Sequence, residues 1–173
     1  MAILDDAAAL RSADLIVPAW TAGALEGDRG KNLVGAVRGG TGLGGIHGGM
    51  GDAFRGALAY EWMVGGHFVG HPHVGDYKVR VTRPDDPIVA GLPTEFDYNS
   101  EQYYMLIDPA VDVLATTEYV HDGKTCEMPV VWTRTWGDGK VFYSALGHAM
   151  AEFDQYPHVF EMTLRGLEWA TQA

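Results

Sequence analysis

The sequence lacks several features that would assign it to common classes of protein. It has a single cysteine, Cys126, so no disulfide can form within the chain, as is usual in a reducing compartment. No apolar run approaches the roughly 20 residues that span a bilayer, and residues 1–6 lack the basic and apolar stretches of a signal peptide. These absences predict a cytoplasmic protein without a membrane segment.

Basic residues are also scarce. Lys and Arg together number 12 against 23 Asp and Glu, which gives a formal net charge of −11 with histidine neutral. Binding to a phosphate backbone or to an anionic membrane surface requires a basic face. We therefore expect neither nucleic acid nor a membrane as a partner.

Three catalytic motifs are missing from the sequence as well. It contains no Walker loop, no Cys-x-x-Cys pair and no Gly-x-Ser-x-Gly elbow. Cys126 precedes Glu127, Met128 and Pro129 and not a strand-to-helix turn, so we interpret it as an incidental thiol.

The composition that remains is that of a globular domain. Hydrophobic residues make up 47% of the 173, which predicts one folded domain, 1–173. Strand and helix patterns alternate in the first half and predict an α/β fold with a mostly parallel, doubly wound sheet flanked by helices. Later strands and an Asp-Gly turn predict an antiparallel extension. The expected helices are 7–11, 28–38, 52–63 and 157–170, and the expected strands are 13–20, 41–46, 77–82, 101–107, 111–117, 128–136 and 141–146.

The most informative segment is the glycine-rich run 42–51, where small residues lead up a strand to His47 and two glycines follow it. A sharp strand-to-helix turn presents its central side chain at the carboxyl edge of a sheet, where ligands bind in open α/β folds. His47 is therefore a candidate functional residue. The pattern alone leaves open a histidine that caps a helix or packs in the turn.

A second histidine, His148, lies just beyond the expected strand 141–146. Neighbouring parallel strands would bring His47 and His148 to one edge of the sheet. A histidine in a surface turn is the alternative for His148.

Three further histidines alternate in the segment 67–73. His67, His71 and His73 could form a zinc site, since imidazole is a common zinc ligand. An exposed loop is the alternative, and we prefer it for His67 and His73. Pro72 restrains His71 to extended geometry.

Glu101 lies beside aromatic residues that include Tyr103. Its carboxylate could act as a base or a metal ligand, with a tyrosine stacking on a sugar face. By pattern alone, a solvated glutamate at a strand start and tyrosines in the core are favoured.

At these residues the sequence resembles the ThuA-like (trehalose utilisation) family, of the class I glutamine-amidotransferase-like superfamily. The matching blocks lie in the family's order and cover nearly the whole chain. They are 13–17, 44–50, 65–68 with 71–72, 87–92, 100–104, 128–132, 139–148 and 165–170. The resemblance implies a flavodoxin-like sheet and a role in the use of trehalose, similar disaccharides or their 3-keto forms.

The resemblance also implies roles for individual residues. His47 matches the family's elbow histidine, Glu101 its acidic Glu-x-Tyr block and His148 its strand-end histidine. These three are the expected catalytic residues and also the expected ligands of a divalent metal such as Zn²⁺, although direct proton transfer remains an alternative. His71, Tyr103 and Asp52 are the expected substrate-binding residues, and a small sugar is the expected partner.

Family members usually begin with an additional strand, helix and strand, and this sequence starts after them. We therefore expect the sheet to lack an edge strand. An open hydrophobic edge invites pairing with another subunit, so we expect a homo-oligomer.

Three functions compete at this point. The first is a carbohydrate-processing enzyme, and the alternative is a non-catalytic sugar-binding or interaction module with a degenerate site. A glutaminase is disfavoured, because it needs an activated thiol at the elbow, where this chain has His47.

Overall fold

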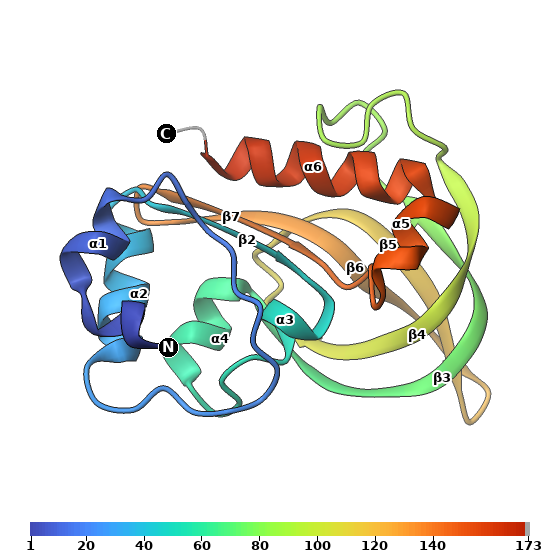
Figure 1. Ribbon diagram of the computed structural model, residues 1–173. Helices are drawn as coiled ribbons and strands as arrows, with labels where there is room; N and C mark the ends of the chain where they lie inside the picture. Colours follow the sequence, from blue (N-terminus) through green and yellow to red (C-terminus); the bar gives the residue numbers. More distant parts are fainter. Residues whose placement is uncertain (172–173) are drawn as a thin grey trace.

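A computed structural model describes residues 1–171, and one seven-stranded β-sheet lies at its centre (Figure 1). The strands are arranged in the order β1-β2-β7-β6-β5-β3-β4. Their bounds are β1 (Leu15–Ile16), β2 (Gly42–Ile46), β3 (Gly66–Val81), β4 (Glu95–Ile107), β5 (Asp112–His121), β6 (Lys124–Trp136) and β7 (Gly139–Ser144). The last two residues of the expected domain 1–173 lie outside the described part.

The sheet is mixed, and only one end of it is parallel. β1 and β7 each pair in parallel with β2, with Ile46 opposite Ser144. The other four pairs, β7–β6, β6–β5, β5–β3 and β3–β4, are antiparallel. The α/β class is confirmed, but the expectation of a mostly parallel sheet is wrong. Two-residue loops at 122–123 and 137–138 join β5 to β6 and β6 to β7, and such loops are too short for a parallel crossover.

Helices cover both faces of the parallel end. Their bounds are η1 (Ala2–Asp5), α1 (Ala7–Ser12), α2 (Arg29–Arg38), α3 (His47–Gly51), α4 (Leu58–Val64), α5 (Met150–Gln155) and α6 (Pro157–Thr171). Figure 1 shows α6 along one face of β2 and β7, with α1, α2 and α4 on the opposite side. Val37 of α2 and Val159 of α6 are fully buried against the sheet. Within residues 1–171, no helix is both long enough and apolar enough to cross a membrane.

Among the differences between expected and observed elements, two lie next to the site. The expected helix 52–63 is wrong: α3 already begins at His47 and α4 begins only at Leu58. Phe54, between them, has a φ of 55°, which the interior of a right-handed helix does not accommodate. The segment 67–73 is not a loop, because it belongs to β3. The doubly wound topology and the missing N-terminal strand stay predictions.

The long strands β3 and β4 form a curved ribbon at the edge of the sheet opposite β1 (Figure 1). Its register shifts twice, between Phe68 and Gly70 and between Gly70 and His73. Such irregularities bend a strand and redirect its side chains. They place His71, which has no register partner on β4, beside Glu101 of β4.

Candidate functional site

His47 occupies a strained turn at the carboxyl end of β2. Its φ of 45° is unusual for a residue with a Cβ and occurs mostly where the surrounding structure enforces it. The Tyr143 hydroxyl, from β7, donates a hydrogen bond of 3.1 Å to the His47 carbonyl oxygen. Gly51, at the end of α3, makes room for this tyrosine, since a Cβ there would lie 2.1 Å from the Tyr143 oxygen. The glycine-rich sequence is therefore required by the packing that holds the turn.

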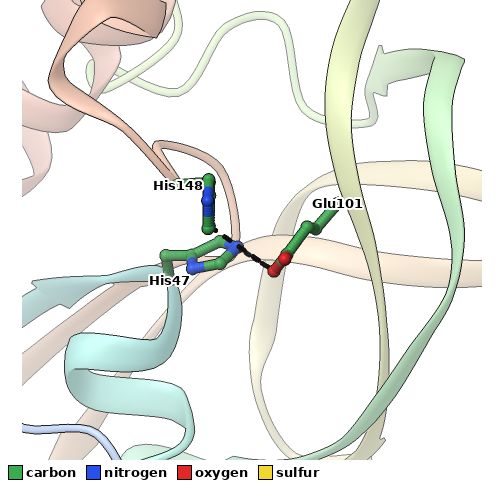
Figure 2. A group of neighbouring side chains, drawn as sticks. All are labelled: His47, Glu101 and His148. Atoms are coloured by element: carbon green, nitrogen blue, oxygen red, sulfur yellow. Dashed lines mark ion pairs between the residues drawn. The ribbon is translucent and has the colours of Figure 1, made fainter.

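The His47 imidazole is buried, at 8% exposure, and its two nitrogens have different surroundings. Nδ1 lies 2.9 Å from the Tyr103 hydroxyl. Nε2 has no hydrogen-bond partner among residues 1–171 and faces Glu101, with Oε2 at 3.5 Å (Figure 2). A buried polar atom without a partner costs about 1–3 kcal/mol in a typical protein.

The Glu101 carboxylate is the centre of the cluster. Its Oε2 also lies 3.5 Å from Nδ1 of His148, and its Oε1 lies 3.8 Å from Nε2 of His71. Figure 2 shows the side chains of His47 and His148 converging on Glu101, which comes from a separate strand, β4. Ligand atoms of His47, Glu101 and His148 all lie within 4.8 Å of one another, and within residues 1–171 this is the one group of three so spaced.

Burial fixes the protonation states of two of these groups. Together with smaller contributions from nearby His148 and His71, it lowers the pKa of His47 to about 3. The same cause raises the pKa of Tyr103, with smaller contributions from Glu101 and Asp52. At neutral pH the His47 ring is therefore neutral and the Tyr103 hydroxyl keeps its proton.

The cluster lies in a cleft of about 630 Å³. One part of its lining is polar and the other is formed by small or apolar residues. The polar lining residues are His47, Asp52, Arg55, His71, Glu101, Tyr103 and His148. All six expected site residues thus reach one cleft, together with Arg55, which the sequence reasoning missed. The apolar residues Val17, Pro18 and Met150 line the same cleft.

Asp52 does not offer a free carboxylate to the cleft. It is buried, and its two oxygens accept hydrogen bonds from Nε and Nη2 of Arg55, the second at 2.8 Å. The Arg55 guanidinium lies 5.6 Å from the centre of the Phe68 ring. Asp52 and Phe68 therefore hold Arg55 in place at the cleft. The spacing of an acid and an arginine three residues apart was the available signal.

The other two histidines of the alternating segment lie elsewhere. Nδ1 of His67 is 3.5 Å from Glu61 Oε2, and Nε2 of His73 lies 3.1 Å from the Asp76 carbonyl oxygen. Neither lines the cleft, so the structure does not form a zinc site from His67, His71 and His73. Cys126 is exposed on β6 and also lies outside the cleft.

The fold and this cleft define an α/β protein with a histidine–glutamate cluster at the carboxyl end of parallel strands. The chain belongs to the ThuA family, described as trehalose utilisation, whose model matches residues 1–170. Membership indicates carbohydrate utilisation in general terms. A comparison with curated proteins finds no match.

Solved structures share the fold at low sequence identity. A ThuA-like protein from Parabacteroides merdae is 19% identical, with a TM-score of 0.74 over 92% of this chain and 70% of that one. A ThuA-like protein from Bacteroides uniformis is 17% identical, with a TM-score of 0.75 over 95% and 71%. A cytoplasmic protein from Salmonella typhimurium is 14% identical, with a TM-score of 0.62 over 96% and 74%.

Proposed function

We propose that the chain is an enzyme that processes a small sugar, trehalose-like or 3-keto, at a divalent metal centre held by His47, Glu101 and His148. The single observation that supports this most strongly is Nε2 of His47, which is buried without a hydrogen-bond partner among residues 1–171 and lies 3.5 Å from Glu101 Oε2. Two imidazoles and one carboxylate are a donor set that Zn²⁺ uses in catalytic sites, where a fourth position stays open for water or substrate.

The residues around the cluster fit this role. With its proton on Nδ1, the His47 ring donates to the Tyr103 oxygen and presents the Nε2 lone pair to the cluster. Metal-bound histidines commonly make a second hydrogen bond of this kind, which fixes the orientation of the ring. Burial keeps His47 neutral, as a ligand must be. When bound, a divalent cation would polarise a carbonyl or hydroxyl oxygen of the sugar.

Substrate binding falls to the side chains that flank the cluster. His71 and Tyr103 line the cleft together with Glu101, and Arg55 presents donors that are held by Asp52. Asp52 thus acts through Arg55. Guanidinium and imidazole donors suit the hydroxyl and carbonyl oxygens of a sugar.

The proposal is tested on protein purified without a histidine tag. Elemental analysis after Zn²⁺ loading should give about one ion per chain, a number set by the single cluster. His47→Ala should lose the ion, with His73→Ala as the matched control at a histidine outside the cleft. Protein that takes up no divalent metal, or a His47→Ala variant that retains it, would contradict the metal centre.

Activity separates the enzyme from the sugar-binding module. Candidate sugars and their 3-keto derivatives are assayed for turnover and for binding with wild type and His47→Ala. An enzyme loses turnover in the variant while it often keeps ligand binding. A module binds sugar without turnover in the wild type, and that result would replace the enzymatic proposal.

A homo-oligomer is also proposed. Both end strands of the sheet, β1 and β4, are paired on one side only, and an unpaired edge is a template for another strand. Sedimentation at micromolar concentration tests this, and a stable monomer would contradict it.

A further inference from the structure

One carboxylate outside the cluster, that of Glu152 in α5, joins the two segments that carry His148 and Glu101. Its Oε2 accepts a hydrogen bond of 3.0 Å from the backbone N–H of His148. Its Oε1 accepts one of 2.8 Å from the hydroxyl of Ser100, the neighbour of Glu101 on β4. The same side chain therefore contacts the turn after β7 and the strand β4.

A tyrosine completes this connection. The Tyr98 hydroxyl donates to Glu152 Oε2 and accepts a hydrogen bond of 3.0 Å from the backbone N–H of Gly147. Tyr98 is only 1% exposed, and burial together with the adjacent Glu152 carboxylate raises its pKa, so the hydroxyl keeps the proton that it donates. The backbone N–H of His148 thus bonds to Glu152 directly, and that of Gly147 is connected to Glu152 through the Tyr98 hydroxyl.

The turn itself depends on α5. Gly147 has a φ of 90°, and a Cβ there would lie 2.8 Å from the ring of Phe153, the residue after Glu152. The helix therefore packs directly on the turn while Glu152 bonds to it. A displacement of α5 would move the backbone of His148.

Glu152 has no cationic partner among residues 1–171. Its two oxygens accept hydrogen bonds from three neutral donors, those of His148, Ser100 and Tyr98. A carboxylate offers several acceptor sites on two oxygens, whereas an amide offers one oxygen and two donors. The single oxygen of a glutamine can accept from at most two of these three donors, and its amide N–H group would face the third.

We propose that Glu152 is the positioning residue of the site, and that its carboxylate sets the separation between the His148 imidazole and the Glu101 carboxylate. The consequence for metal affinity rests on the proposed function, while the consequence for the turn 147–148 does not. Metal affinity depends on ligands held at the right separation, and loss of an outer hydrogen-bonding partner typically reduces it about 10–100-fold.

The test uses full-length, tag-free protein and Zn²⁺ itself as the probe, with affinity measured by competition with a chromophoric chelator. Glu152→Gln removes acceptors at nearly constant volume, and Glu152→Asp keeps the charge but withdraws it by one methylene. Asp154→Asn changes the same charge on the same helix at an exposed position and is the control. Both Glu152 variants should bind Zn²⁺ about 10–100-fold more weakly than wild type, and the control should match wild type.

Two comparisons separate positioning from other effects. If Glu152 acted only through its charge near a cation, Glu152→Asp would bind as tightly as wild type, and that result would overturn the proposal. In a His148→Ala background, Glu152→Gln should weaken binding much less than in the wild type, because the ligand that it positions is gone. An undiminished effect there would also overturn it.

A second measurement does not depend on metal. Amide hydrogen exchange in the metal-free protein should become at least about tenfold faster at His148 in Glu152→Ala, which offers that N–H no acceptor, as expected when a hydrogen bond worth roughly 1.5 kcal/mol or more is lost. Tyr98→Phe gives the same readout at Gly147, whose N–H then loses its acceptor, if the alanine variant does not fold. A wild type without bound Zn²⁺ would refute the metal centre alone, whereas unchanged exchange in these variants would refute the role of Glu152.

Discussion

The parallel and antiparallel parts of the sheet contribute to the site in different ways. The parallel end, β1, β2 and β7, is covered by helices on both faces and supplies its histidines from the residues just after the strands, His47 and His148. The antiparallel ribbon of β3 and β4 supplies Glu101 and Tyr103 from the interior of a strand. A cleft where two sheet types meet can thus combine side chains that neither type would bring together alone.

The difference also concerns rigidity. The turn at His47 is enclosed by β7 and α3, and its strained φ is enforced by close packing. The ribbon reaches the cluster through register shifts and through hydrogen bonds such as the one between Tyr103 and His47. We expect changes in the parallel end to affect folding, and changes in the ribbon to affect chiefly the site.

The largest effect is expected when a ligand is removed from either part. His47→Ala on the parallel side and Glu101→Gln on the ribbon should each weaken Zn²⁺ binding by more than about 100-fold, beyond the range for outer-shell changes. Isothermal titration of tag-free protein measures this, with His73→Ala as the control. Full affinity in one of the two variants would show that the centre is not shared between the parts.

A smaller but substantial effect is expected from Gly51→Ala. Its new methyl group would overlap the Tyr143 hydroxyl, which lies 2.1 Å from the Cβ position, so the free energy of unfolding should fall. Overpacking of this kind costs about 1–3 kcal/mol. The matched control is Gly70→Ala in the ribbon, where nothing lies within 4 Å of the Cβ position. Equal urea denaturation midpoints for the two variants would contradict the expected difference in rigidity between the parallel end and the ribbon.

The loss of the Tyr103 hydroxyl tests the contribution of the ribbon to the site. Tyr103→Phe removes the partner of His47 Nδ1 and should weaken Zn²⁺ binding about tenfold, the lower end of the outer-shell range. Tyr104→Phe is the control, since Tyr104 contacts Tyr119 and lines no part of this cleft. Chelator competition measures both, and the account would be wrong at this point if the two variants behaved alike.

The smallest effect concerns pH in the metal-free protein. Burial lowers the pKa of His47 from 6.5 to about 3, so between these values the unfolded chain binds a proton that the folded chain excludes. The contribution of this group to the free energy of unfolding is therefore fully present above the unfolded pKa of 6.5, and it is lost as the pH falls below that value. Between about pH 6.5 and pH 5.5 the loss is about 1 kcal/mol.

The measurement is the free energy of unfolding in urea at these two pH values. His47→Gln should lose about 1 kcal/mol less than wild type over the interval. His121→Gln, at an exposed histidine of the β5–β6 hairpin, should follow wild type. If wild type and His47→Gln show the same pH dependence, the His47 ring is not excluded from water as described.

The two parts also differ in how far the sequence predicts them. Glycines before His47 and the strand before His148 mark strand ends, and the rule that ligands bind at the carboxyl edge places both histidines together. The position of Glu101 follows from no local pattern. β4 begins six residues earlier than expected, and the direction of its side chains depends on register shifts in β3 that only the folded ribbon defines. The family resemblance was needed to select it.

Other features escaped prediction for similar reasons. Only Gly66 is buried in the first half of β3, so this half shows no alternation of apolar residues and resembles a loop. The expected helix 52–63 continued a helical spacing through Phe54, where packing imposes a positive φ. Glu152 lies in a helix of six residues that buries none of its side chains fully, and its role depends on partners about 50 residues away.

The most direct test of the account is a crystal structure of tag-free protein grown or soaked with Zn²⁺, with anomalous scattering recorded at the zinc edge. The account predicts one strong peak about 2.0–2.2 Å from Nε2 of His47, Nδ1 of His148 and an oxygen of Glu101, with the fourth position facing the cleft. A cluster without a peak at saturating Zn²⁺, or a peak only at other residues, would contradict it.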